Sequence, residues 1–310
     1  MVILHIGHND GSHINNTVRQ LRKEGIQCTG ITFYYSEKQE TDNIFCFKKW
    51  QFILYYLTFI FLALKCDIVH LWSEQVPGIV LFLKLIRKPF VVEWTGSDIR
   101  DPKQTQLMHL CSNEYVIGSC ARYARNVSKF WKSLNIFSSH VLINHLPHNN
   151  KIHIPHRLDL DRFKWNPTVR TPLRVAHCTS NREAKGTDLI LEAIKGLDIE
   201  FDLIENVSRA EAIERVSECD IVIGQMVWGE HGTQELESIA MGKPVLCYIN
   251  HDKPTPVLKC KTNEIVKWIQ YFQANPCQIR AQAYLSYVEL INEQIEAIES
   301  LKKVYSAYCI

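Results

Sequence analysis

Residues 173–197, LRVAHCTSNREAKGTDLILEAIKGL, combine an apolar strand, a short polar turn and an amphipathic helix. We expect the strand at 173–180 and the start of the helix at Gly186. The turn between them carries Arg182 and Lys185. A helix N-terminus gathers unpaired backbone N–H groups and the positive end of the helix dipole, which attract anions and disfavour cations. Two cations at this point therefore predict a site for a multiply charged anion such as a diphosphate.

The same alternation of strand and helix recurs along most of the chain. In the first half we expect helices at 15–24, 50–64, 77–86 and 121–134, between strands at 2–7, 28–33, 67–72, 89–96, 115–120 and 140–145. In the second half, helices at 186–197, 208–219 and 232–241 alternate with strands at 201–205, 220–225 and 244–249. This pattern predicts an α/β fold of right-handed βαβ units with doubly wound parallel sheets.

One segment interrupts the alternation and indicates two domains. Residues 147–172 are rich in proline, asparagine and charge, without helical periodicity, which is typical of a linker. We expect an N-terminal domain at 1–165, a C-terminal domain at 166–280, and a helix at 281–310 that packs back toward the first domain. Ligands of such sheets bind at the carboxyl ends of the strands, so a cleft between the domains is the expected site.

Composition limits the classes of function. The 310 residues carry a formal net charge of only +2, which disfavours a dedicated nucleic-acid-binding protein. Eleven scattered cysteines without a C-x-x-C pair are typical of reduced thiols, and the chain opens without a secretory signal, so we expect a cytoplasmic protein. The chain has no H-E-x-x-H motif and no paired cysteine ligands, so we expect neither a metal ion nor a cofactor.

Residues 50–64, WQFILYYLTFIFLAL, form an almost wholly apolar segment with Lys48, Lys49 and Lys65 at its ends. The segment is shorter than the roughly 20 residues that span a bilayer. A helix buried against the sheet is the favoured interpretation. Its basic flanks and aromatic residues keep a second interpretation open, peripheral membrane contact through 48–65.

A second stretch, GQMVWGEHGTQELESIAMGKPV at 224–245, fits a nucleotide. Gly232 and Thr233 open a helix and offer backbone N–H groups to an anion. Glu237 lies one turn further along an otherwise apolar helix, where it can accept hydrogen bonds from a ribose diol. A diphosphate beside Arg182 and Lys185 with its ribose at Glu237 would satisfy both stretches.

Two loops of the first half also follow strands. The glycine-bracketed loop 7–13 can approach phosphates or an acceptor closely. The loop 94–102 contains Asp98, which is as well suited to capping the following segment as to binding an acceptor or a sugar. His70 lies in an apolar strand, so a structural role as a hydrogen-bonded core residue is at least as well supported as a catalytic role. The acceptor-side candidates from these loops are His8, Asn9, Asp10, Thr95, Ser97, Asp98 and Arg100.

Several of these stretches resemble the signatures of retaining GT-B glycosyltransferases of family 4. They are NREAKGTDLILEAI, GxxELESIAMGKPV, IPHRLDLDRF, TGSDIRDP and KCDIVHLW, which follow one another in the family's order over nearly the whole chain. The resemblance implies the GT-B fold, two Rossmann-like domains that face a central cleft. It implies that Arg182 and Lys185 neutralise a nucleotide diphosphate in place of a metal, and that Glu237 holds the ribose.

The chain departs from that family at two positions. A glutamate that often contacts the donor sugar is replaced by Gly229, with Glu230 adjacent, and the histidine of the family's HGSD loop is replaced by Thr95. The expected catalytic residues are Arg182, Lys185 and Asp98. The expected donor-binding residues are Gly11, Ser180, Asn181, Arg182, Lys185, Gly229, Glu230, His231, Gly232, Thr233 and Glu237.

Together these features predict a metal-independent glycosyltransferase that moves a sugar from a UDP-sugar to an acceptor hydroxyl with retention. The acceptor is left open between a glycan, a lipid-linked molecule and another class, with nucleic acid disfavoured by the charge. Two alternatives remain: a catalytically degenerate nucleotide-binding subunit of a glycosylation complex, and a nucleotide-sugar epimerase of the same fold.

Overall fold

The computed structural model describes residues 1–7, 9, 12–32, 41–72, 78–95, 129–130, 133–145 and 150–308. These residues form two compact units. The first comprises the described residues up to Asp159 together with those from Gln294 onward, and the second contains Leu160–Glu293. The long C-terminal helix, α10 (Cys277–Tyr308), therefore contributes residues to both units.

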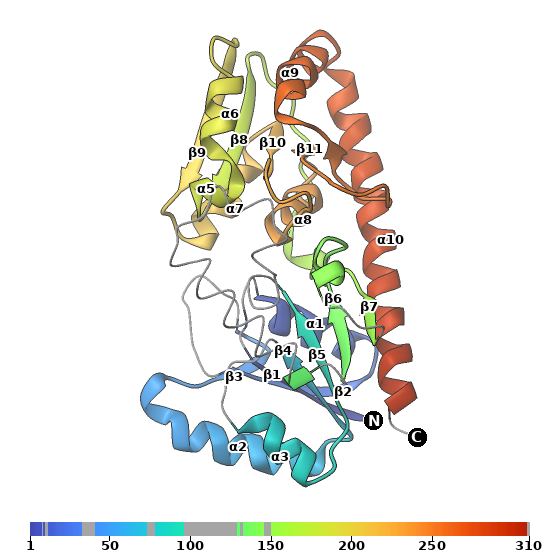
Figure 1. Ribbon diagram of the computed structural model, residues 1–310. Coiled ribbons are helices and arrows are strands. Elements are labelled where there is room, and N and C mark those ends of the chain that lie inside the picture. The colour runs from blue at the N-terminus through green and yellow to red at the C-terminus, as the bar shows by residue number, and fades with distance from the viewer. Residues whose placement is uncertain are drawn as a thin grey trace. The chain divides into compact units, whose positions relative to one another are not determined.

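The first unit is built on a sheet of seven described strands in the order β3-β2-β1-β4-β5-β6-β7, with every pair of neighbours parallel (Figure 1). The strands are β1 (Val2–Gly7), β2 (Gln27–Thr32), β3 (Ile44–Cys46), β4 (Ile68–Trp72), β5 (Phe90–Trp94), β6 (Leu134–Phe137) and β7 (Lys151–His153). The helices are α1 (His13–Lys23), α2 (Phe52–Lys65) and α3 (Ile79–Leu85), with 3-10 turns η2 (Lys49–Gln51), η4 (Leu142–His145) and, at the start of the second unit, η5 (Leu160–Arg162).

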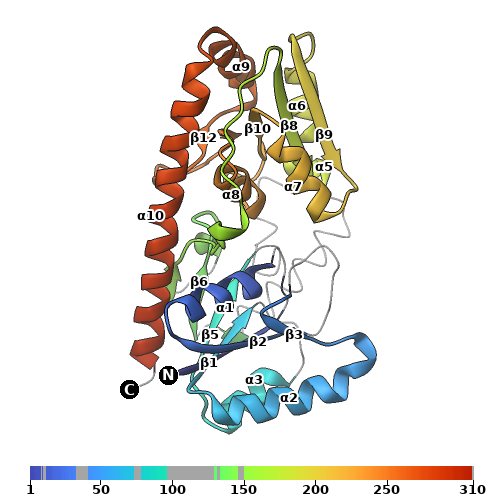
Figure 2. The same cartoon turned by 180° about the vertical axis from the view of Figure 1, so that it is seen from behind.

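Alternation along the strands divides the core of this unit into two layers. Leu4 and Ile6 of β1 pack with α2 and α3, whereas Ile3 packs with α1 and the last turns of α10. Successive side chains of a strand point to opposite faces of the sheet. The apolar runs of β1, β4 and β5 therefore supply both layers, and helices cover both faces (Figure 2).

The second unit contains a five-stranded parallel sheet in the order β12-β11-β10-β8-β9 among its described residues. Its strands are β8 (Leu173–Thr179), β9 (Ile199–Glu205), β10 (Ile221–Ile223), β11 (Val245–Cys247) and β12 (Leu258–Lys259). Its helices are α5 (Arg182–Lys185), α6 (Thr187–Ala193), α7 (Arg209–Ser217), α8 (Thr233–Ala240), α9 (Ile265–Ala274) and the first part of α10, with the 3-10 turn η6 (Thr262–Glu264). The sequence pattern did not predict β12 or α9.

The edge of the first sheet differs from the sequence-based prediction. The strand predicted at 140–145 is instead the 3-10 turn η4, and the edge is formed by β6 and β7. β6 begins at the last residue of the helix predicted at 121–134 and continues into a stretch with no predicted element, and β7 lies inside the predicted linker. The reason is Asn135, a polar residue in the middle of β6. Its side chain accepts from Trp94 Nε1 at 2.8 Å and donates to the backbone oxygen of Ser133 at 2.6 Å, so it is buried without breaking the strand.

Candidate functional site

The turn after β8 places Arg182 and Lys185 on a helix of their own. Asn181 caps it, with Oδ1 accepting the Ala184 N–H at 3.0 Å. Gly186 follows in the left-handed conformation at φ 72° and separates α5 from α6. Lys185 is therefore the last residue of α5, and not simply a residue ahead of the longer helix that the sequence predicted.

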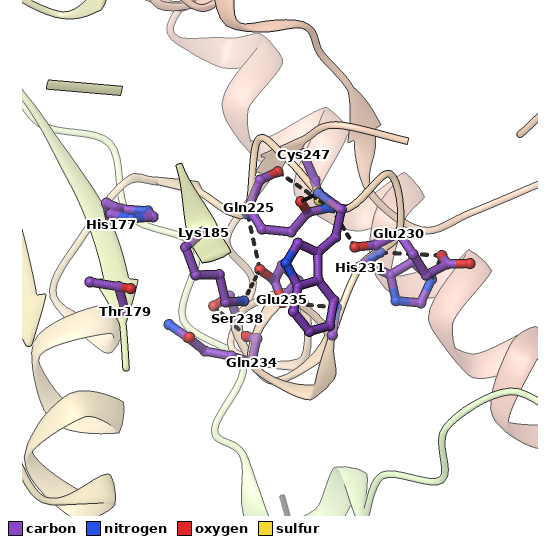
Figure 3. A network of polar contacts seen from close by, with 12 residues as sticks. His177, Thr179, Lys185, Gln225, Glu230, His231, Gln234, Glu235, Ser238 and Cys247 are labelled. Atoms are coloured by element: carbon purple, nitrogen blue, oxygen red, sulfur yellow. Dashed lines mark hydrogen bonds and ion pairs between the residues drawn. The ribbon is translucent and has the colours of Figure 1, made fainter. Parts of the chain in front are cut away.

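Lys185 forms a largely buried ion pair with Glu235, from the first turn of α8. Nζ lies 2.7 Å from Glu235 Oε1, and the side chains are 21% and 2% exposed (Figure 3). Two backbone N–H groups also donate to this carboxylate, Gly232 at 2.9 Å and Gln225 at 3.1 Å. Sequence reasoning missed Glu235, although its place three residues after Gly232 is the glutamate position of a capping box.

Electrostatics keep this pair ionised. Burial by itself raises the pKa of Glu235, but Lys185 and the backbone donors outweigh it and lower that pKa to about 2. Burial likewise lowers the pKa of Lys185, and the attraction of Glu235 reverses the effect and raises it. The site therefore holds a full positive charge at Lys185 over the whole physiological pH range.

The ammonium of Lys185 lies against the N-terminus of α8. A Cβ placed on Gly232 would be 4.0 Å from Lys185 Nζ, and the Lys185 carbonyl oxygen accepts the Met226 N–H at 2.9 Å, just beyond β10. Thr233 is the first residue of α8. The structure thus brings Lys185, Gly232 and Thr233 together at the carboxyl ends of β8 and β10, where parallel sheets bind ligands.

Arg182 lies at the surface and is also paired. Its Nε and Nη2 donate to the two carboxylate oxygens of Glu205 at 2.8 and 2.9 Å, and Nη1 lies 3.4 Å from Asp188. Hydrogen bonds to Glu205 raise the pKa of Arg182. Its side chain is 46% exposed, so solvent screens these interactions. Both cations of the turn have protein carboxylates as partners, which the sequence pattern did not reveal.

Glu237 is buried on α8 and is held by Arg209, the first residue of α7. Arg209 Nη2 donates to Glu237 Oε1, and the two side chains are 20% and 10% exposed. Burial raises the pKa of Glu237, while Arg209 opposes that shift. A carboxylate in this position can accept further hydrogen bonds from ligand hydroxyl groups.

Gln225 organises the loop that leads to α8. Its Oε1 accepts the N–H groups of Val227 and Trp228 at 2.9 and 2.6 Å, and its Nε2 donates to the carbonyl oxygens of Glu230 and Tyr248. Every polar atom of the amide is thereby used to fix the backbone. No sequence motif marked Gln225; only its place at the end of the strand predicted at 220–225 could have drawn attention to it.

The two sugar-side candidates of this loop have different surroundings. Gly229 adopts φ 75°, and a Cβ there would lie 2.5 Å from Asn250 Cβ, so the backbone leaves no room for a side chain. Glu230 is buried, with Oε2 3.2 Å from His251 Nε2 and Oε1 3.6 Å from His231 Nε2. A carboxylate and two imidazoles thus lie close together in and beside this loop, and Glu230 and His231 directly follow Gly229 in the sequence.

His177 connects the strands and the helix that carry the site residues. It is fully buried in β8, with Nδ1 2.8 Å from the Ile223 carbonyl oxygen and Nε2 2.9 Å from Thr187 Oγ1. It therefore ties β8 to β10 and to the start of α6. Burial lowers its pKa, which favours the neutral imidazole.

The remaining candidates from the sequence are placed as follows. Ser180 is exposed beyond β8, Thr95 is partly buried directly after β5, and Asn9 is buried after β1, where its Oδ1 accepts the Asn15 N–H at 3.1 Å. Six candidates lie outside the described residues: His8, Asp10, Gly11, Ser97, Asp98 and Arg100.

A buried polar cluster occupies the first sheet. Arg157 Nη2 donates to both carboxylate oxygens of Glu93 at 2.6 Å, His70 Nε2 lies 3.1 Å from Glu93, and His70 Nδ1 lies 2.7 Å from the Tyr305 hydroxyl. Trp72 Nε1 donates to His5 Nδ1 at 3.1 Å. His70 is thus a hydrogen-bonded core histidine that joins α10 to the sheet.

No group of metal-ligating side chains occurs within the described part of the chain. The chain does contain one D-x-D triplet, Asp159-Leu160-Asp161, the arrangement that often binds metals. Asp159 is buried and lies 2.8 Å from Arg19 Nε and 2.6 Å from Lys23 Nζ. Its charge is therefore balanced by protein cations.

Comparison with solved structures identifies the architecture. Anabaena HepE, crystallised with UDP and glucose, aligns with a TM-score of 0.60 and 13% identity over 98% of this chain and 100% of that one. Sucrose-phosphate synthase from Thermosynechococcus elongatus aligns with a TM-score of 0.68 and 10% identity over 99% of this chain and 98% of that one. A variant of S. aureus TarM, crystallised with Fondaparinux, α-GlcNAc-glycerol and UDP, aligns with a TM-score of 0.66 and 9% identity over 99% of each chain. The predicted GT-B fold is confirmed. No protein-family model and no curated protein matches the sequence.

Proposed function

We propose that this chain is a glycosyltransferase that moves a sugar from a nucleoside-diphosphate sugar, with UDP as the nucleotide, to an acceptor hydroxyl. One observation carries the proposal: the ammonium of the largely buried Lys185 side chain lies against the N-terminus of α8, at the carboxyl ends of β8 and β10. UDP bound to HepE and TarM, which share this fold, supports the choice of nucleotide.

Departure of the nucleoside diphosphate is the step that needs stabilisation, because negative charge develops on the leaving phosphate. Lys185 would meet that charge together with the positive end of the α8 dipole, and both are fixed before the ligand arrives, whereas the Gly232 N–H already donates to Glu235. Arg182, at the exposed end of α5, would contribute a second cation by exchanging Glu205 for a phosphate. Glu237 would accept hydrogen bonds from the ribose.

We also propose that the sugar is transferred with retention of its anomeric configuration, as in family 4, and that the reaction needs no metal ion. The two cations of α5 support metal independence, because they can supply the positive charge that a metal would otherwise bring. No side-chain nucleophile is proposed for the transfer. Comparison of the anomeric configuration of donor and product by NMR tests retention, and activity in EDTA tests the second property.

The direct experiment incubates the protein with UDP-, GDP-, ADP- and TDP-sugars in the presence of EDTA and measures the released nucleoside diphosphate. We expect release from a UDP-sugar by the wild type and its loss in Lys185→Ala. Lys195→Ala is the matched control, because Lys195 is an exposed lysine of the same unit. Absence of UDP binding to the wild type, measured by calorimetry, would overturn the proposal.

Gly229 favours a second candidate, a nucleotide-binding subunit without transfer activity. The position has no space for the glutamate that contacts the donor sugar in related enzymes. In that case the wild type would bind UDP, and Lys185→Ala would abolish this binding. The wild type would consume no nucleotide-sugar donor, whichever acceptor is offered. The enzyme and the subunit therefore differ in turnover and not in nucleotide affinity.

A further inference from the structure

Helix α2 presents apolar side chains to solvent along its whole length. Ile53, Leu57, Phe61 and Leu64 are 54–61% exposed, and Trp50, just before the helix, is 75% exposed. The apolar sequence favoured burial of this helix, but only Tyr55, Phe59 and Ala63 are fully buried among its residues. A helix on the surface of a protein normally turns charged and polar groups outward.

Helix α3 extends this apolar surface. Ile79, Val80 and Leu83 are buried, whereas Leu81 and Leu85 are 73% and 79% exposed. Both helices pack on the same face of the first sheet (Figures 1 and 2). The rings of Phe59 and Phe82 lie 5.6 Å apart. We call the exposed apolar residues of 50–64, together with Leu81 and Leu85, the α2–α3 face.

The two segments that form the α2–α3 face carry charges of one sign, and the half-exposed Asp67 follows the first of them after Lys65. Residues 48–65 and 78–88 contain no aspartate or glutamate, and their six basic residues are Lys48, Lys49, Lys65, Lys84, Arg87 and Lys88. Lys65 Nζ lies 4.0 Å from the centre of the Phe61 ring, so a cation borders the apolar side chains directly. Exposed apolar area of this extent indicates a binding surface, and the basic border selects a negatively charged occupant.

We propose that the α2–α3 face docks on the surface of an anionic lipid bilayer. Leucine, isoleucine, phenylalanine and tryptophan side chains would enter the interface between headgroups and acyl chains, and the lysines would meet anionic headgroups. No helix among the described residues is long and apolar enough to cross a membrane, so contact is through the surface. This inference does not depend on the proposed sugar transfer.

A second copy of the chain fits the face less well. In a twofold dimer the same surface meets itself, so the basic residues of one copy would approach those of the other. Residues 48–65 and 78–88 supply no carboxylate that could pair with them. Burying these cations without partners would oppose association.

The test is co-sedimentation of the full chain with vesicles. We expect binding to vesicles of phosphatidylcholine mixed with phosphatidylglycerol, weaker binding to phosphatidylcholine alone, and release by added salt. Leu57→Gln combined with Leu64→Gln is expected to weaken binding by at least about tenfold, because two side chains no longer enter the bilayer. Lys65→Glu combined with Lys84→Glu should remove the preference for the anionic lipid.

Matched controls lie on α10, which packs on the opposite face of the sheet. Ile295→Gln changes a side chain that is 59% exposed, as Leu57 is, and Lys303→Glu reverses an exposed lysine. Both should bind vesicles as the wild type does. Absence of wild-type binding to anionic vesicles, or equal loss in the controls, would overturn the proposal. A dimer in ultracentrifugation that Leu57→Gln and Leu64→Gln dissociate, without vesicle binding, would assign the face to a second copy.

Discussion

Lys185 Nζ and Glu235 Oε1 lie 2.7 Å apart although their residues are 50 positions apart in the sequence. The pair is largely buried, and two backbone N–H groups also donate to the carboxylate. Glu235 therefore compensates a buried cation and holds it in place before any ligand binds. A diphosphate at the N-terminus of α8 would share the ammonium with Glu235, since Lys185 has three N–H donors.

Glu235→Gln tests this sharing. The amide keeps an oxygen acceptor, but Lys185 loses its counter-charge, and the free energy of unfolding should fall by about 3 kcal/mol. Bound UDP would restore negative charge, so UDP should raise the melting temperature more in Glu235→Gln than in the wild type. Thermal unfolding with and without UDP measures both effects, with the exposed Glu200→Gln as the control. If UDP raised the melting temperature equally in the wild type, Glu235→Gln and Glu200→Gln, this would argue against a diphosphate at Lys185.

Removal of both charges should cost less than removal of either one. Lys185→Met leaves Glu235 as an uncompensated buried carboxylate, and Glu235→Gln leaves Lys185 as an uncompensated cation. In the double variant neither penalty remains, so a double-mutant cycle should give a coupling of about 2 kcal/mol or more. Urea unfolding of the four proteins measures it. Additive losses would show that the two side chains act independently.

Acid should destabilise the fold in two stages. Burial lowers the folded-state pKa of His5 and His70 below the ordinary value of 6.5, so below that pH the unfolded chain binds more protons and stability falls. Each such histidine contributes up to about 1.4 kcal/mol per pH unit. The lowered pKa of Glu235 adds stability that is complete above its ordinary value of 4.5 and is lost as pH falls toward about 2.

Urea unfolding at a series of pH values tests the first stage. His5→Gln should reduce the slope of stability against pH between about 6.5 and 5, because one group no longer takes up a proton on unfolding. The wild type should show the steeper slope over the same range. Identical slopes would mean that His5 is protonated equally in the folded and unfolded states.

Gly229→Ala should destabilise the second unit. The position combines φ 75° with a Cβ that would lie 2.5 Å from Asn250 Cβ, so backbone strain and a steric clash act together. We expect a loss of about 2–3 kcal/mol in the free energy of unfolding. Gly196→Ala is the control, since φ there is 79° and nothing lies within 4 Å of the added methyl group; it should cost about 1 kcal/mol. Equal costs at the two positions would contradict the clash.

Arg209→Ala should make nucleotide affinity depend on pH. Burial raises the pKa of Glu237 and Arg209 opposes the rise, so without Arg209 the carboxyl group would be protonated at a higher pH. A protonated Glu237 accepts ribose hydroxyl groups less well than the carboxylate. Calorimetric titration with UDP should therefore show a steeper loss of affinity with decreasing pH in the variant than in the wild type. Parallel pH profiles would remove Glu237 from the ribose site.

Local pattern alone predicted most of the regular structure of the second unit. Apolar strands such as 173–179 and the helix at 233–240 carry strong periodic signals and clear end signals, so neighbouring residues decide them. The short strand β6 escaped prediction because Asn135 interrupts its apolar pattern, and the strand forms only because Trp94 and backbone oxygens satisfy that amide.

The sequence by itself determined the parallel α/β units, the two cations of the turn after β8, and the glycine that opens α8. Tertiary structure alone decided the partners of the charges: Glu235 for Lys185, Glu205 for Arg182 and Arg209 for Glu237. The physical reason is strand order. In a parallel sheet β10 lies beside β8, although β9 and α7 separate them in the chain, so charges from distant segments meet at one edge. No local pattern encodes which of them pair.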